Sequence, residues 1–241
     1  MPVTRWLFTC EHGGREVPDE YRELLAGAPL ASHCGWDAGA LEVFSALASA
    51  HADAAYAATV TRLLVDLNRS LHNPRVWSAW TRRLPAAERE RVAARWWRPW
   101  RAEVAGVVAG WLKSGARAVH VAVHSFTPVL GGLHRTADIG LLYDPAHGGE
   151  RALCAAWRSL LAAGGWRVRL NYPYRGASDG HTTALRRRFG DAYAGIELEL
   201  NQALFPSRQH ALITDLVVSL AVLRRAAAST ASRANATGEL G

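Results

Sequence analysis

Two histidines of the chain each follow an apolar stretch that has the character of a buried strand. His12 comes shortly after the stretch WLF at 6–8, and His124 lies near the end of the run AVHVAVHSF at 118–126. Apolar runs of this kind predict strands, so each imidazole is expected where a strand enters a polar loop. Two histidines with one carboxylate and an open position for water are typical of a hydrolytic zinc site. A structural role for either histidine is the alternative, and there is no HExxH motif to decide between them.

Two glutamates in the stretch GIELELN at 195–201 form a second candidate group. Glu197 and Glu199 are two positions apart, so in a strand both face the same side of the sheet. Unpaired buried carboxylates are costly. We therefore expect one to be a general base acting on a metal-bound water and the other to pair with an arginine; an edge strand with a solvated face is the alternative. Glu11 is not expected to share an ion with His12, because adjacent strand residues point to opposite sides.

Other polar residues are candidates for binding a ligand. Arg69, in DLNRS, carries a guanidinium that can bind a carboxylate in bidentate fashion, although a salt bridge to Asp66 fits the pattern equally well. The glycine pair at 13–14 permits a turn that keeps the preceding imidazole aimed inward, or is an ordinary turn. The segment NYPYRGASDGHTT at 171–183 is rich in turn formers and predicts either a rim loop that clamps a ligand or a plain surface loop.

The rest of the pattern alternates apolar runs of strand length with amphipathic helical segments. Strands are predicted at 6–10, 63–68, 118–126, 139–144, 166–173 and 194–201. Helices are predicted near Asp19 and at 37–52, with Asp37 as N-cap, and then at 85–114, 149–164 and 207–228. This alternation predicts a single α/β domain, 1–226, with a mixed, mainly parallel sheet and helices on both faces. The polar segment 227–241 is predicted to be disordered.

Sites in open α/β sheets form at the carboxyl ends of strands. That rule places the candidate histidines and carboxylates at one rim, together with the polar residues of the DLNRS stretch. These residues can therefore form one site although they are far apart in the sequence.

Composition and net charge limit the kinds of protein that this chain can be. The chain has 241 residues, of which 49% are hydrophobic, and no apolar run is long enough to predict a membrane helix or a secretory signal. Cys10, Cys34 and Cys154 form no CxxC pair, which favours a reducing, cytoplasmic setting and argues against a thiolate zinc site. The net charge of +7 fits an anionic small molecule or a nucleic acid. The arginines are spread along the chain, however, so solvated helix faces are the simpler interpretation and no nucleic acid is expected.

Seven motifs in a fixed order resemble the N-formylglutamate amidohydrolase family. They are CEHGG…VP, GWDAGA, LLVDLNRS, VHSFTPVL, RTADIGLLYD, NYPYRG…DG.TT.LRRRF and YAGIELELNQ, and they extend from about residue 7 to 205. The resemblance implies a phosphorylase/hydrolase-like α/β fold, similar to that of zinc carboxypeptidases and aspartoacylases. It also implies a metal-dependent hydrolase that cleaves the amide of an N-formyl or N-acyl amino acid. The reference reaction, a late step of histidine degradation, converts N-formyl-L-glutamate and water to formate and L-glutamate.

The resemblance further implies a metal site. His12, Asp37 and His124 would hold Zn2+ or another divalent metal. Glu16 is the alternative third ligand, because the related carboxypeptidases take a glutamate from just after their first histidine.

The resemblance assigns the remaining roles to residues outside the metal site. Glu197 would be the general base and Arg69 would hold the α-carboxylate of a small anionic N-acyl amino acid, with Arg135 and Asn171 as candidates for its other polar groups. Two alternatives remain: a metal-free small-anion-binding protein on the same scaffold, and a basic nucleic-acid-binding module. The sequence does not predict the oligomeric state.

Overall fold

A six-stranded sheet forms the centre of the protein. The computed structural model describes residues 2–238, with side chains to residue 228. The strand order is β2-β1-β3-β8-β6-β7. The strands are β1 (Thr4–Cys10), β2 (Ala54–Ala57), β3 (Arg117–Phe126), β6 (Ile139–Leu142), β7 (Val168–Leu170) and β8 (Tyr193–Asn201). All neighbouring pairs are parallel except β6–β8, so the sheet is mixed and mainly parallel, as predicted.

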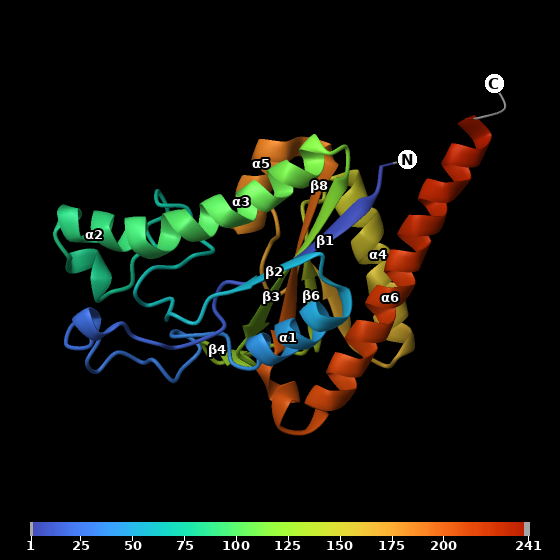
Figure 1. Ribbon diagram of the computed structural model, residues 1–241. Helices are drawn as coiled ribbons and strands as arrows, with labels where there is room; N and C mark the ends of the chain where they lie inside the picture. The colour runs from blue at the N-terminus through green and yellow to red at the C-terminus, as the bar shows by residue number, and fades with distance from the viewer. Residues whose placement is uncertain (1, 239–241) are drawn as a thin grey trace.

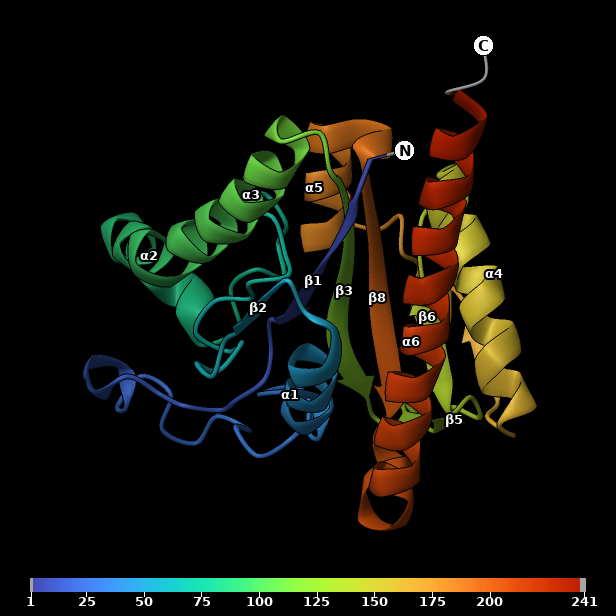
Figure 2. The ribbon, with the colours of Figure 1, turned by 45° about the vertical axis from the view of Figure 1, so that its right-hand side comes forward.

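Helices cover both faces of this sheet (Figures 1 and 2). One face carries α1 (Ala40–His51), α4 (Gly148–Ala163) and α6 (Phe205–Gly238), and the other carries α3 (Arg98–Lys113) and α5 (His181–Phe189). The short α2 (Ala86–Val92) continues into α3 through a π-helical turn at Ala93–Trp97. None of the helices in the described part of the chain is both long and apolar enough to cross a membrane. The three layers confirm the predicted α/β class.

The two faces of the sheet differ in chemistry because side chains alternate along each strand. On the face toward α1, α4 and α6, residues such as Phe8, Val121 and Leu198 form the largest apolar cluster. On the opposite face the central strands carry a smaller apolar cluster, which includes Leu7 and Tyr193. Toward the carboxyl ends most strand residues on this second face are polar, such as His120, His124 and Glu199. The polar side chains therefore gather at the carboxyl ends of β1, β3 and β8.

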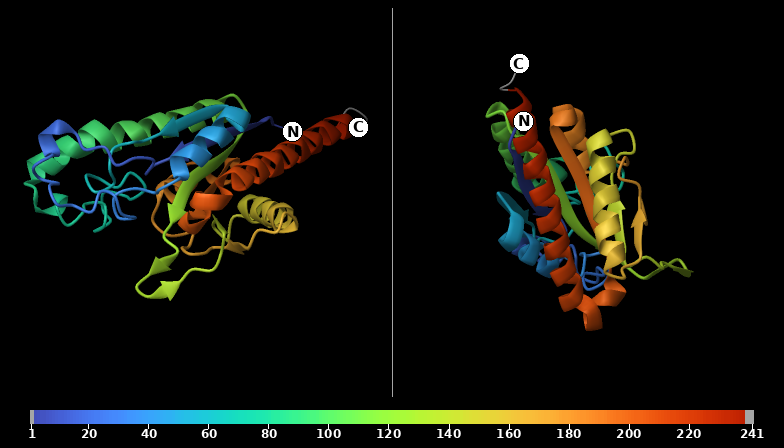
Figure 3. Two further views of the ribbon diagram at one scale, coloured as in Figure 1. Left: turned by 90° about the horizontal axis from the view of Figure 1, so that it is seen from below. Right: turned by 90° about the vertical axis from the view of Figure 1, so that its right-hand side faces the viewer.

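A hairpin projects from the body of the protein between β3 and β6 (Figure 3). It consists of β4 (Val129–Leu130) and β5 (Leu133–His134), joined by Gly131 and Gly132. Both glycines have positive φ, of 56° and 78°, which residues with a Cβ rarely adopt. The turn therefore depends on glycine.

Two sequence predictions of local structure are wrong. Residues 63–68 form turns and not a strand; their leucines pack with tryptophans in a separate apolar cluster beside the sheet, and the second strand is β2. Asp37 is not the N-cap of α1. That position is occupied by Gly39 with φ 77°, where an added Cβ would approach the ring of Phe205 to 2.4 Å. The Asp37 side chain is thereby free to enter the site.

The other predicted elements are confirmed to within a few residues, except that the helix predicted at 207–228 continues to Gly238 as α6. The predicted rim loop at 171–183 is shorter than expected, because α5 begins at His181. The predicted disordered tail, 227–241, falls almost wholly beyond the described side chains and stays a prediction, although the helical backbone of α6 extends to Gly238.

Candidate metal and active site

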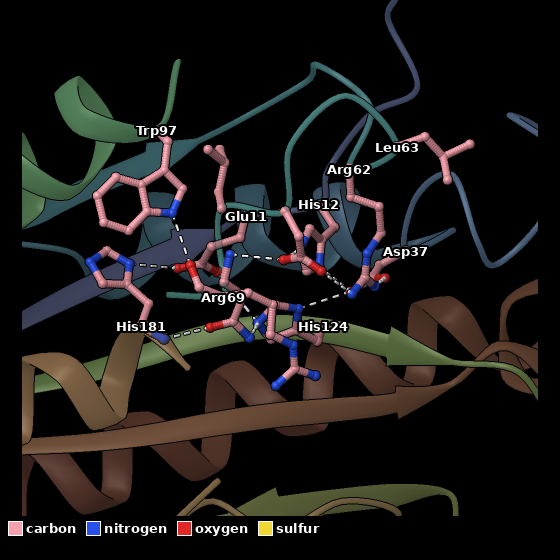
Figure 4. A network of polar contacts seen from close by, with 12 residues as sticks. Glu11, His12, Asp37, Arg62, Leu63, Arg69, Trp97, His124 and His181 are labelled. Carbon is pink, nitrogen blue, oxygen red and sulfur yellow. Dashed lines mark hydrogen bonds and ion pairs between the residues drawn. The ribbon is translucent and has the colours of Figure 1, made fainter. Parts of the chain in front are cut away.

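A cavity of about 690 Å3 lies at the carboxyl ends of β1, β3 and β8. His12, Asp37 and His124 lie in its wall, and all three side chains are buried (Figure 4). The imidazole centroids of His12 and His124 are 5.1 Å apart. One candidate ligand atom from each of the three residues lies within 4.8 Å of the others, a grouping that could hold a metal ion.

Each imidazole directs one nitrogen toward Asp37 and the other toward a different carboxylate. Nδ1 of His124 lies 2.8 Å from Oδ2 of Asp37, and Nδ1 of His12 lies 3.3 Å from the same oxygen. Nε2 of His12 lies 2.8 Å from Asp66 Oδ1, and Nε2 of His124 lies 3.4 Å from Glu11 Oε2. Metal-binding histidines usually donate their second ring N–H to a carboxylate or carbonyl, which fixes the tautomer. His12 has this arrangement with Asp66, and at His124 the carboxylate of Glu11 lies close to the second nitrogen without a hydrogen bond to it.

Arg62 compensates part of the negative charge of the cluster. Its Nη1 donates to Asp37 at 3.2 Å and its Nη2 to Asp66 at 2.6 Å. Burial opposes the charged form of both aspartates, but the positive groups around them dominate. His12 and Arg62 hold the pKa of Asp37 well below its usual range, and Arg62 and His12 do the same for Asp66. Both carboxylates are therefore ionised and available as electron-pair donors.

His124 is held in its protonated form when no metal is bound. Burial alone would lower its pKa, but the hydrogen bond to Asp37 and the charges of Asp37 and Glu11 raise the pKa to about 10. A ligand histidine must be neutral. Metal binding at this cluster would accordingly release a proton.

A second polar network lies beneath the first, away from the cavity. Glu11 is fully buried; its Oε1 accepts from Thr9 Oγ1 at 2.8 Å and lies 3.3 Å from His181 Nδ1. Thr9 in turn lies 2.7 Å from Nε2 of His120, whose Nδ1 lies 2.7 Å from the Tyr193 hydroxyl. Burial lowers the pKa of His120 to about 3 and that of His181 to about 4, so both are neutral.

The two glutamates of β8 face the cavity on the same side of the strand, as predicted, but their surroundings differ. Glu197 is partly exposed, and its Oε1 accepts from Thr182 Oγ1 at 2.9 Å. Glu199 is buried, and its Oε2 has no hydrogen-bond partner among the described residues. Burial, with the charges of Asp37 and Glu197, raises the pKa of Glu199 to about 8. At neutral pH Glu199 is therefore mainly protonated in the metal-free protein.

Comparison with known proteins identifies the family. The family model for N-formylglutamate amidohydrolase matches residues 4–205, most of the chain. The chain belongs to the N-formylglutamate amidohydrolase family.

Two solved structures share the fold. A gene product from Agrobacterium tumefaciens is 27% identical, with a TM-score of 0.78 over 90% of this chain and 91% of that one. A structure described as N-formylglutamate amidohydrolase from Ralstonia eutropha JMP134 is 18% identical, with a TM-score of 0.72 over 93% of this chain and 94% of that one. A search of curated proteins finds no match to the chain.

The other residues that the family resemblance singled out lie in different surroundings. Arg69 lines the cavity, and its Nη1 donates to the carbonyl of Asp179. Arg135 and Asn171 are not among the described residues that line it. The guanidinium of Arg135 lies over two aromatic rings, and the Asn171 Oδ1 accepts from the backbone N–H of Tyr143 at 3.1 Å. Their predicted contacts with substrate stay predictions.

Glu16, the alternative third ligand, is likewise absent from the described lining of the cavity; it accepts from Thr59 Oγ1 at 2.7 Å. Sequence reasoning did not select Arg62, His181 or the contact between Glu11 and His124. Arg62 stands four residues before Asp66, directly before the strand predicted at 63–68. No signal in the sequence indicates that Arg62 donates to both Asp66 and Asp37.

Proposed function

We propose that this family member hydrolyses the amide bond of an N-formyl or N-acyl amino acid with the help of a bound divalent metal, Zn2+ in the first instance. The observation that carries the proposal is the convergence of His12, Asp37 and His124 beside the glutamates of β8, in a cavity of a chain of this family. The reference reaction is the conversion of N-formyl-L-glutamate and water to formate and L-glutamate.

The donor set fits Zn2+. Two imidazole nitrogens and one carboxylate oxygen are the ligands of many catalytic zinc sites, which keep a further position open. Asp66 and Glu11 lie next to the outer nitrogens of the two imidazoles, which supports the neutral tautomers that a metal requires. When bound, such an ion supplies Lewis acidity to the scissile carbonyl and to the attacking water.

Glu197 is assigned the role of general base. It would take a proton from the attacking water and deliver it to the leaving amine nitrogen as the amide C–N bond breaks. The described contacts hold only its Oε1, by Thr182, so Oε2 is available to water in the cavity. Glu199 suits this role less well, because its raised pKa keeps it protonated near neutral pH in the metal-free protein.

Arg69 is assigned to the substrate's α-carboxylate. It lines the cavity, and no ion pair to it is found among the described residues. A guanidinium binds a carboxylate through two parallel hydrogen bonds, which fixes the orientation of the substrate as well as its position. Correct orientation of the amide relative to Glu197 would follow from this contact.

The deciding experiment measures metal and turnover on the same preparation. Elemental analysis of the purified protein is expected to find zinc or another divalent metal. Amine release from N-formyl and N-acyl amino acids is expected to stop with a chelator and return with added Zn2+. Tight ligand binding with neither metal nor turnover would support the small-anion-binding protein in place of the enzyme.

One variant tests the general base separately from the metal site. Glu197→Gln is expected to keep its metal and to lose about 100- to 10,000-fold in kcat, the usual contribution of a positioned base. Full activity in this variant would remove Glu197 from the mechanism.

A further inference from the structure

The cavity is larger than a formyl amino acid requires. Its volume of about 690 Å3 lies within the range of roughly 300–1,000 Å3 that encloses drug-sized ligands. A formyl group adds only a carbon, an oxygen and a hydrogen to the amino acid that carries it. A formylated substrate held at the metal cluster would therefore leave much of the cavity to solvent.

One end of the cavity is polar and held in place by hydrogen bonds. Arg69 donates to the Asp179 carbonyl, and Asn73 Nδ2 donates to the Asp179 carboxylate at 2.7 Å. Trp97 Nε1 donates to the Arg69 carbonyl at 2.8 Å, which ties this end to the π-helical turn before α3. This is the end assigned to the substrate's carboxylate.

Apolar side chains form another part of the wall. Leu63, Phe126, Leu130 and Tyr174 all line the cavity. Figure 4 shows Leu63 on the far side of His12 and Asp37 from Trp97. Phe126 is two residues beyond His124 on β3, on the same face, so it lies further out along the strand by roughly 7 Å. Leu63 thus lies on the other side of the metal cluster from Trp97, whose indole donates to the backbone of Arg69.

Arg135 fixes two of these aromatic rings. Its guanidinium carbon lies 5.7 Å from the ring centre of Phe126 and 5.2 Å from that of Tyr174. Its Nη1 also lies 3.3 Å from the Tyr174 hydroxyl. Phe126 packs edge-on against Tyr172 with a centroid distance of 6.4 Å. Contacts within the protein therefore hold two rings of the apolar wall in place, as is usual for small-molecule sites.

The projecting hairpin supplies the outer part of the wall. Leu130 is 41% exposed although it lines the cavity, and its partner across the hairpin, Leu133, is 75% exposed. An apolar group in the cavity would remove part of the Leu130 surface from water, which is favourable in proportion to the area covered. A formyl group has too little apolar surface to do so.

We infer that the substrate carries an apolar acyl group larger than formyl, which packs against Leu63, Phe126, Leu130 and Tyr174 while Arg69 holds the carboxylate. The inference rests on the proposed function, since it takes the same metal cluster and general base for granted. In the reaction, water adds its oxygen to the acyl carbon, the C–N bond breaks, and the nitrogen receives a proton. The products are a longer carboxylate and a free amino acid.

A matched substrate series tests the acyl preference. Amine release is measured from N-formyl-, N-acetyl-, N-butyryl- and N-hexanoyl-L-glutamate, and from the same derivatives of L-leucine. We expect kcat/KM to rise along the series by up to about fourfold for each methylene that becomes fully buried. Hydrolysis that is fastest for the formyl derivative and slower for every longer one would overturn the inference and leave the proposed function intact. No hydrolysis of any member, with zinc bound, would overturn both.

Two variants of the hairpin test whether the wall at Leu130 is responsible for the preference for longer acyl groups. Leu130→Asp is expected to lower kcat/KM for the hexanoyl substrate at least tenfold more than for the acetyl substrate, because it places a charge on the apolar wall. Leu133→Asp changes an exposed leucine of the same hairpin that is not among the described lining residues, and is expected to leave the ratio unchanged. Equal ratios in both variants and the native protein would refute the assignment of this wall to the acyl group.

Discussion

His120 and His124 lie on the same face of β3, four residues apart, and both are buried, yet their protonation behaviour is opposite. Burial lowers the pKa of His120 to about 3. For His124 the same effect of burial is outweighed by Asp37 and Glu11, and the pKa rises to about 10. His120 instead contacts the neutral hydroxyls of Thr9 and Tyr193. The comparison shows that the partner of a buried imidazole, and not its burial, decides whether it is suited to charge-dependent chemistry.

The two polar networks to which these histidines belong differ in the same way. The cavity cluster of His12, Asp37 and His124 opens onto space that a ligand can enter. The network beneath it, from Glu11 to Tyr193, is closed off and its histidines are neutral. Buried polar networks are expensive unless fully satisfied. Within the described residues the lower network meets the cavity cluster through Glu11, whose Oε2 lies 3.4 Å from His124 Nε2, and through Asn68, which accepts from the backbone N–H of His181 and lies 3.4 Å from the same nitrogen.

The largest difference is expected when the two histidines of β3 are replaced in turn. His124→Ala should abolish metal binding and lower kcat/KM by about a thousandfold or more, since a lost metal forfeits several kcal/mol of transition-state stabilisation. His120→Ala should retain one equivalent of metal and lose mainly stability. Zinc content by elemental analysis separates the two. Unchanged zinc in His124→Ala would refute its role as a ligand and remove the contrast.

A smaller effect is expected at the contact between the networks. Glu11→Gln removes the charge next to His124 Nε2 with little change in shape, and loss of such an outer partner typically costs about 10- to 100-fold in metal affinity. Zinc affinity is measured by competition with a chromophoric chelator.

Tyr193→Phe is the matched control for that measurement. It removes a hydrogen bond from the far end of the same network, at His120 Nδ1, and should lower the melting temperature without changing zinc affinity. If both variants weakened zinc binding equally, the lower network would act through the general stability of the fold and not through Glu11.

The smallest expected effect is on the pH dependence of the stability of the metal-free protein. The pKa of His124 is higher in the folded protein, about 10, than the ordinary value of 6.5, so its contribution to stability is fully present below about pH 6.5 and is lost as pH rises through 10. His120, with a pKa of about 3, has the opposite sign: its contribution is present above pH 6.5 and is lost as pH falls. In chelator, His124→Gln should therefore show a weaker decline in Tm between pH 7 and 10 than the native protein, by about 5 °C. Identical slopes would show that the imidazole is neutral in the metal-free fold.

The parts of the fold that the sequence predicts well are those where one periodicity dominates. The run at 118–126 and the alternation at 194–201 became β3 and β8 almost residue for residue. The segment 63–68 has the same apolar character, but its leucines cover a tryptophan-rich cluster outside the sheet. The apolar character of a short run does not predict which surface of the protein its side chains will pack against. The strand β2, AAYA, carries too little hydrophobic signal to be recognised.

The candidate site also has parts that the sequence predicts and parts that it does not. The rule for carboxyl ends of strands brings His124 and Glu197 to one rim, and the family resemblance adds Asp37, whose proximity to both histidines the structure bears out. The contact between Glu11 and His124 was not predictable. Glu11 follows β1 directly, and the pairing of β1 with β3 aligns Thr9 with Ala122, which brings Glu11 level with His124, whose Nε2 lies 3.4 Å from its Oε2. Register across two strands that are more than a hundred residues apart is set by packing and not by local pattern.

The order of the strands has a consequence for how the candidate site is assembled. The candidate ligands come from the end of β1, the loop before α1 and the end of β3, and β8 closes the other side of β3 only after 192 residues have been made. An emerging chain can thus present the two imidazoles well before the acidic strand that completes the pocket. The pocket around the candidate ligands is therefore complete only when β8 has joined the sheet.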